Sequence, residues 1–111
     1  MVSENLHDVV VVGAGPAGLS AAMFTARRGL KTLVMATDVG GQLALTDGVE
    51  NYPGVPLIGG RELISHFREQ AERDGAEIRL ARVVAVERRG ELDPLTYTIR
   101  TAEGGEFETR A

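Results

Sequence analysis

The chain has 111 residues, which allows one domain at most and is short for a parallel sheet with helices on both faces. Its composition, with 43% hydrophobic and 25% charged residues, is ordinary for a globular protein, and a net charge of -4 without a basic cluster argues against a nucleic-acid partner. Because the chain contains no cysteine, it forms no disulfide, thiolate metal site or cysteine redox centre within these residues.

Residues 1–7 are predicted to form a polar N-terminal tail. They lack the apolar stretch of a secretory signal, and no later apolar run is long enough to span a bilayer. We therefore expect a cytoplasmic protein without a membrane partner.

The stretch that follows this tail predicts a strand, a glycine turn and the start of a helix. Val9–Val12 are β-branched and continuously apolar, which is typical of a parallel strand buried on both faces. Gly13, Gly15 and Gly18 have the G-x-G-x-x-G spacing that allows a tight turn, close approach of a pyrophosphate and close helix–strand packing. Pro16 suits the first turn of the helix, whose free amides and dipole favour phosphate. The pattern predicts dinucleotide binding.

Residues 16–28 are predicted to form the helix and residues 30–35 a second parallel strand, which completes a βαβ unit. In such units an acidic residue usually ends the second strand and binds a ribose hydroxyl. Here Thr37 follows the strand and the nearest acid is Asp38. Either residue could take that role, and a plain loop without a role is the alternative.

Residues 37–60 predict a long loop, which is ordered because it carries apolar and aromatic side chains. Residues 61–74 predict an amphipathic helix. Its apolar stripe comprises Leu63, Ile64, Phe67 and Ala71. Strands are then predicted at 77–80, 83–87, 95–101 and 106–110, the last three forming an antiparallel β-meander.

No residue of the chain is predicted to be catalytic or to bind a metal. There is no nucleophile–base pair, no paired carboxylates and no cluster with metal-ligand spacing. The two histidines are isolated: His7 is expected at the surface and His66 on the side of a helix.

Three motifs together resemble the low-molecular-weight thioredoxin reductases. They are Gly13-Ala14-Gly15-Pro16-Ala17-Gly18, Gly40-Gly41-Gln42-Leu43 and Val49-Glu50-Asn51-Tyr52-Pro53-Gly54. The first is common among flavoproteins, whereas the second and third in tandem are more specific, and the resemblance extends from residue 8 to the end. It implies an α/β fold: a Rossmann-like βαβ FAD-binding domain, a parallel sheet with helices, plus a short antiparallel β-meander, incomplete at the C-terminus.

The resemblance also implies a set of FAD contacts. The pyrophosphate would be bound by Gly13, Ala14, Gly15, Pro16, Ala17 and Gly18. The adenosine would be approached by Thr37, Asp38 and the backbone of Val83 or Val84. The flavin side would be lined by Gly41, Gln42 and Leu43, with Asn51 hydrogen-bonding toward the isoalloxazine ring.

Family members continue with an NADPH domain that carries a Cys-x-x-Cys pair, and neither is present in this chain. The resemblance thus implies that residues 8–111 are the N-terminal portion of an FAD-binding domain. The complete protein would pass electrons from NADPH through FAD to a thioredoxin-like disulfide protein, and the chain alone would be inactive.

Two alternatives remain open at this stage. The chain could be a non-catalytic flavin- or nucleotide-binding module, or a split subunit completed by a partner. It could also be a relative of the ferredoxin-NADP reductases with the same fold. In either case the sheet would lack its next strand, and since parallel edges are normally covered, we expect a homodimer or a strand-completing partner.

Overall fold

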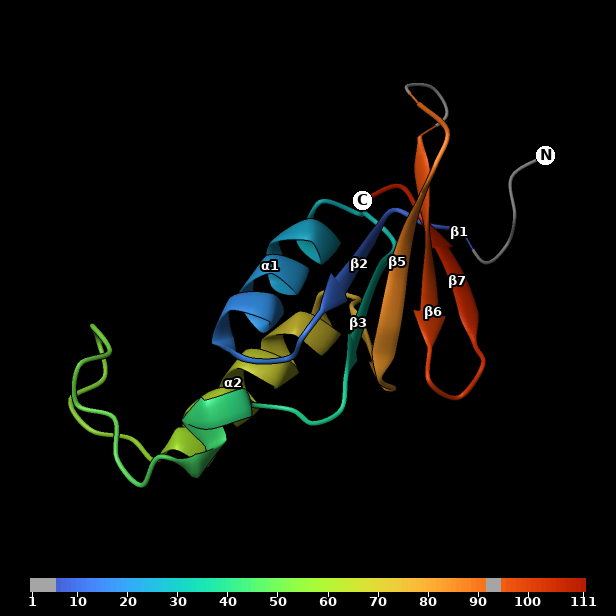
Figure 1. Cartoon of the computed structure of the whole chain (residues 1–111). Coiled ribbons are helices and arrows are strands. Elements are labelled where there is room, and N and C mark those ends of the chain that lie inside the picture. Colours follow the sequence, from blue (N-terminus) through green and yellow to red (C-terminus); the bar gives the residue numbers. More distant parts are fainter. Residues whose placement is uncertain (1–5, 92–94) are drawn as a thin grey trace.

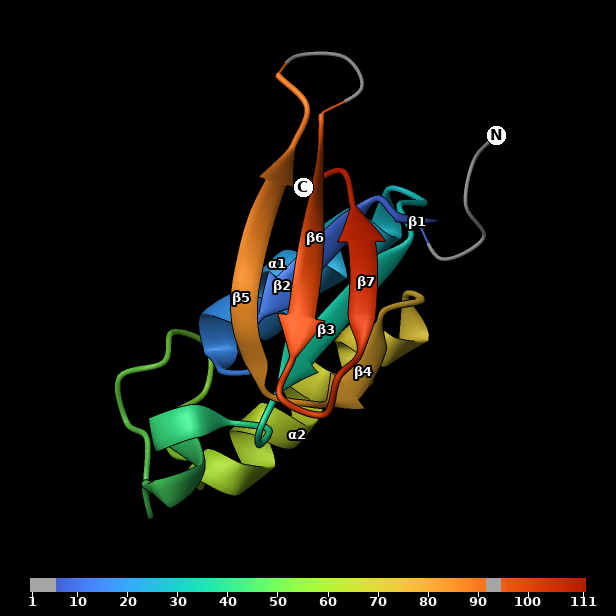
Figure 2. The ribbon, with the colours of Figure 1, turned by 45° about the vertical axis from the view of Figure 1, so that its right-hand side comes forward.

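The structure is a computed structural model of the chain, and it describes residues 6–91 and 95–111. Three layers follow one another: two helices, a parallel sheet and a mainly antiparallel sheet (Figures 1 and 2). In chain order the elements are β1 (Leu6–His7), β2 (Val9–Val12), α1 (Pro16–Arg27), β3 (Thr32–Ala36), the 3-10 helix η1 (Gly41–Leu45), α2 (Gly60–Arg73), β4 (Glu77–Leu80), β5 (Val83–Arg89), β6 (Thr96–Thr101) and β7 (Glu106–Thr109).

The middle layer is a three-stranded parallel sheet in the order β2-β3-β4. All five residues of β3 are buried, as expected of a central parallel strand. Burial of β2 on both faces was predicted from its valines and is wrong: its first three residues are half-buried and Val12 is 57% exposed. The reason is topological, because β2 lies at the edge of this sheet.

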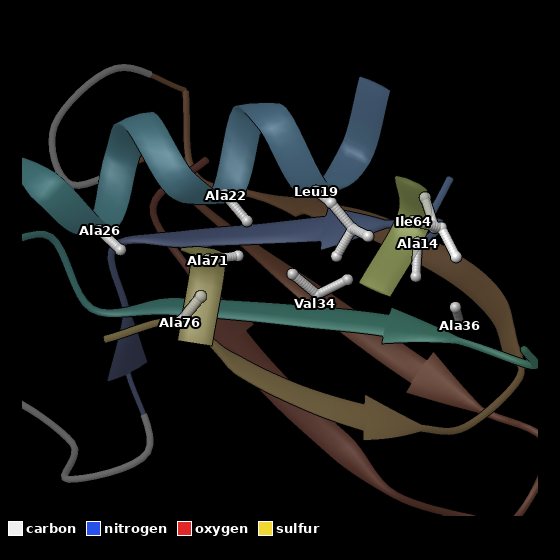
Figure 3. Packing of buried hydrophobic residues seen from close by; sticks show 9 residues of the cluster. All are labelled: Ala14, Leu19, Ala22, Ala26, Val34, Ala36, Ile64, Ala71 and Ala76. Atoms are coloured by element: carbon white, nitrogen blue, oxygen red, sulfur yellow. The ribbon is translucent and has the colours of Figure 1, made fainter. Parts of the chain in front are cut away.

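The helical layer covers one face of the parallel sheet. In Figure 3 the side chains of Leu19 on α1 and Val34 on β3 meet between the two layers, with Ile64 and Ala71 of α2 beside them. Small alanines on α1 let its backbone approach the sheet closely. The predicted apolar stripe of α2 faces this core, so its amphipathic pattern is confirmed.

The third layer confirms the predicted β-meander. Strands β5, β6 and β7 pair antiparallel in sequence, and Leu33, Met35 and Ile99 form a second core between the two sheets. Strand β1 pairs parallel to β7, so His7 is only 8% exposed and its ring lies 6.5 Å from that of Phe107. The expectation of a surface histidine is therefore wrong, because a two-residue strand held by a distant partner leaves no local sequence signal.

The ladder between β1 and β7 continues past both strands. The amide of Ala111 donates to the carbonyl oxygen of Asp8 (3.1 Å), and the amide of Val10 donates to the carbonyl oxygen of Ala111 (2.9 Å). This alternation is a parallel bridge between Val9 and Ala111. Residue 111 therefore lies along the edge of β2 that does not face β3.

Ion pairs lie on the exposed surfaces of both sheets and of α2. The Nε of Arg100 donates to Glu87 at 2.9 Å, and this hydrogen bond, with the positive charge behind it, lowers the pKa of Glu87. On α2 an i,i+4 pair joins Arg68 and Glu72 at 2.9 Å. Such exposed pairs contribute little to stability.

No helix of the described residues is long and apolar enough to cross a membrane.

Candidate functional site

The carboxyl ends of β2, β3 and β4 meet at one edge of the parallel sheet, where ligands of open α/β sheets bind. A cavity of about 310 Å³ lies at this edge. It is lined by Val12, Gly13, Ala14, Gly15, Met35, Ala36, Thr37, Asp38, Gly41, Ala81, Arg82 and Val83. The segments that follow β2, β3 and β4 are distant in sequence, and all three contribute to one site.

The turn from β2 into α1 forms one wall of the cavity. The amide of Gly13 donates to the carbonyl oxygen of Met35 (2.8 Å), which ties the turn to β3. Gly15 caps α1, and the first intrahelical bond runs from the amide of Leu19 to its carbonyl oxygen (3.0 Å). The backbone N–H groups of Ala17 and Gly18 have no partner within the helix, and Pro16 has no N–H group. The first turn of α1 carries no acidic residue. This helix end is therefore suited to an anion.

Two glycines of this turn have different surroundings: there is free space at Gly15, whereas Gly18 is in close backbone contact. A Cβ on Gly15 would meet no atom within 4 Å, so the backbone faces free space. A Cβ on Gly18 would overlap the carbonyl oxygen of Gly13, so helix and turn are in direct backbone contact. A pyrophosphate fits this arrangement, because it needs bare amides in front and a rigid turn behind.

Thr37 and Asp38, just after β3, line the cavity with exposed side chains. The predicted ribose contact thus has both of its candidates in place, and the choice between them stays a prediction. Beside them, the amide of Ala81 donates to the carbonyl oxygen of Ala36 (2.9 Å), and the amide of Arg82 donates to the carboxylate of Glu103 (3.2 Å). These bonds hold the β4–β5 connection at the rim.

Sequence reasoning missed Ala81 and Arg82 as members of the cavity. Part of the signal was available, because both residues directly follow the predicted strand at 77–80, but the parallel pairing of that strand with β3 was not predicted. Of the residue pair proposed near the adenine, Val83 lines the cavity, whereas Val84 is 59% exposed and does not.

The Gly41–Leu45 turn brings the second motif beside the first. The amide of Gly40 donates to the carbonyl oxygen of Ala14 (2.8 Å), and a Cβ on Gly41 would lie 4.0 Å from the Cα of Gly15. Gln42 is exposed next to the cavity, and Leu43 packs against the helical core. Of these predicted flavin-side residues, only Gly41 lines the cavity itself.

The third motif lies elsewhere. Val49 and Ile58 exchange two backbone hydrogen bonds of 2.7 and 3.1 Å, closing a loop at the helical end of the protein (Figure 1). The ring of Tyr52 on this loop packs edge-on against that of Phe67 on α2, with the ring centroids 5.9 Å apart. Asn51 lies on this loop and borders a separate open cavity of about 490 Å³ formed by residues 50–56. The structure does not join Asn51 to the cavity at the sheet edge, so its flavin contact stays a prediction.

The remaining residues of the first motif, Pro16, Ala17 and Gly18, lie in the first turn of α1 and do not line the cavity at the sheet edge.

Comparisons with known proteins match the chain to one family and point to one cofactor. The FAD binding domain family matches residues 8–86. Thioredoxin reductase of Aquifex aeolicus is 43% identical over 106 residues, covering 94% of this chain and 32% of that protein. Thioredoxin reductase of Bacillus subtilis is 39% identical over 112 residues, covering 100% and 34%.

A solved structure gives the same result for the fold. The crystal structure of Lactococcus lactis thioredoxin reductase superposes with a TM-score of 0.87 and 40% identity, covering 95% of this chain and 33% of that chain. The chain therefore spans about a third of the length of the relatives it matches.

Proposed function

Because the chain belongs to the FAD binding domain family and matches one part of the longer, low-molecular-weight thioredoxin reductases, we propose that it binds FAD as the first part of such a reductase. One observation carries this proposal: the turn that is open at Gly15 and closed at Gly18 sits at the N-terminus of α1, at the carboxyl edge of a parallel sheet. This is where a dinucleotide pyrophosphate binds.

FAD would supply the electron-transfer chemistry, and the residues of this chain would bind and orient it. The free amides of α1 would hold the pyrophosphate, and Thr37 or Asp38 would accept a hydrogen bond from a ribose hydroxyl. The backbone of Ala81 and Val83 would pack against the adenine. None of these groups is a nucleophile or a general base, which suits binding rather than proton transfer.

We further propose that turnover requires the parts of the relatives that this chain does not match. Electrons would enter from NADPH and leave to a thioredoxin-like disulfide protein. The first step needs a nicotinamide site, and residues 1–111 carry no second G-x-G-x-x-G motif; the second step needs a thiol, and these residues contain no cysteine. Alone, the chain would bind the cofactor without reducing a disulfide.

An alternative, a binding module completed by another strand, is favoured by the edge of β2. Ala111 already pairs with Val9 there, while Val12 stays 57% exposed beside an apolar cavity of about 390 Å³ that Val10, Val86 and Ile99 also line. Strand addition at such an edge, or dimerisation through it, would satisfy its free backbone groups. A monodisperse monomer that melts cooperatively would contradict this alternative.

Nucleotide competition tests the proposed function. We expect ADP to displace FAD, because the β2–α1 turn and the ends of β3 and β4, which line most of the cavity, bind the half of FAD that ADP shares. FMN, which lacks the adenosine, is expected not to compete at the same concentrations. The measurement is the amount of FAD that stays with the protein after each nucleotide is added and the small molecules are removed on a desalting column, with the bound flavin identified by mass. Displacement by FMN but not by ADP would contradict the assignment of the cavity.

A further inference from the structure

The N-terminus of α2 is in direct backbone contact with η1. A Cβ on Gly60 would overlap the carbonyl oxygen of Leu43 and lie 2.6 Å from that of Thr46. The amide of Gly60 donates to the carbonyl oxygen of Thr46 (3.0 Å), so the contact is also a hydrogen bond. Gly60 is buried, and no residue with a side chain fits at this position.

The other end of η1 is fixed to the phosphate-binding turn. Gly40 donates to the carbonyl oxygen of Ala14 and has a φ of 112°, a conformation that favours glycine. The side chain of Ile64 on α2 lies 3.4 Å from where a Cβ on Gly40 would be. The short segment from Gly40 to Thr46 is therefore held at its start by the β2–α1 turn and at its end by α2.

Between these two anchors lie the residues that face outward. Gly41 lines the cavity and Gln42 is exposed beside it. Neither has a tertiary side-chain anchor of its own, because one has no side chain and the other points to solvent. Their position relative to Gly15 is set by the two backbone anchors.

We propose that Gly60 is a positioning residue for the flavin half of the bound cofactor. Its missing side chain lets α2 support η1, and this support sets the distance between Gly41 and the phosphate-binding turn. The inference rests on the proposed function, since it assigns the part of FAD beyond the pyrophosphate to η1. The ADP half is held by the ends of β2, β3 and β4, which Gly60 does not touch.

The test compares two neighbouring glycines. Gly60→Ala is expected to weaken FAD binding at least about tenfold. The added Cβ would push η1 out of the position in which it contacts the cofactor, and a small displacement of a binding segment is costly. The ADP affinity of the variant is expected to fall much less, because Gly41 is the cavity's one residue on η1 and its other lining residues lie outside the segment that Gly60 supports. Gly59→Ala is the matched control: the added Cβ would lie 3.7 Å from the carbonyl oxygen of Asp47, an ordinary contact, and φ is -65°. Both of its affinities are expected to stay unchanged.

A second measurement needs no nucleotide. Amide hydrogen exchange of Gly40, Thr46 and residue 60 reports the anchors of η1 directly, and we expect faster exchange at these amides in Gly60→Ala with unchanged exchange in β3. Equal loss of FAD and ADP affinity would show a general folding defect and overturn the proposal, as would an unchanged FAD affinity with unchanged exchange.

These measurements test separately whether the chain binds FAD and whether Gly60 positions η1. If the wild-type chain binds neither nucleotide, the proposed function fails. The exchange data then decide alone whether Gly60 positions η1, and unchanged exchange would overturn it.

Discussion

Gly18→Ala is expected to lower the free energy of unfolding of the nucleotide-free chain by about 3 kcal/mol or more. Helix propensity alone predicts the opposite sign, since alanine is favoured over glycine inside a helix by about 1 kcal/mol. The overlap decides, because the new Cβ would meet the backbone oxygen of Gly13, and neither α1 nor the turn can give way without breaking the contact with β3. Urea denaturation followed by circular dichroism measures the effect.

The sign of the change in the free energy of unfolding distinguishes the two effects, because propensity raises the stability and the overlap lowers it. A Gly18→Ala variant as stable as the wild type, or more stable, would contradict the close contact between α1 and the turn. Ala21→Gly is a useful comparison, because Ala21 is exposed on the same helix and its loss is expected to cost only the propensity difference of about 1 kcal/mol.

Gly15→Ala is expected to have the reverse profile, with little change in folding and a large loss of cofactor. Its Cβ would meet nothing within 4 Å, and its φ of -80° is open to any residue, so the free energy of unfolding should change by less than about 1 kcal/mol. The methyl group would stand where the pyrophosphate must approach the amides of α1. We expect FAD affinity to fall by about 100-fold, measured by flavin fluorescence titration.

Ala21→Ser provides the control for this variant, because it changes the same helix outside the cavity and should leave FAD affinity unchanged. Unaltered FAD binding by Gly15→Ala would mean that the phosphates lie elsewhere. Read together, the two glycine variants separate the part of the motif that supports the fold from the part that admits the cofactor.

Elements with a strong local pattern were predictable from the sequence. The valine strand, the helix beginning at Pro16, the amphipathic stripe of α2 and the β-meander all form, and no end is shifted by more than two residues. Each is specified by periodicity or by a turn residue within the element itself. The cavity residues that follow β2 and β3 were predicted from the same patterns, because parallel strands put their carboxyl ends at one edge, whereas Ala81 and Arg82 after β4 were missed.

Features that depend on distant contacts were not predictable. Strand β1 and the burial of His7 result from pairing with β7, about a hundred residues along the chain, for which a two-residue segment carries no pattern. The exposure of Val12 depends on which strand lies at the edge of the sheet. The role of Gly60 is visible only once α2 and η1 are seen in backbone contact.

The flavin content of the chain tests the central claim most directly. The 111-residue protein is purified without added cofactor and passed over a size-exclusion column, with visible absorbance, flavin released on denaturation and molar mass measured on the same peak. We predict about one FAD per chain, identified by mass as the dinucleotide. A folded chain that carries no flavin, and takes up none when FAD is added, would contradict the account.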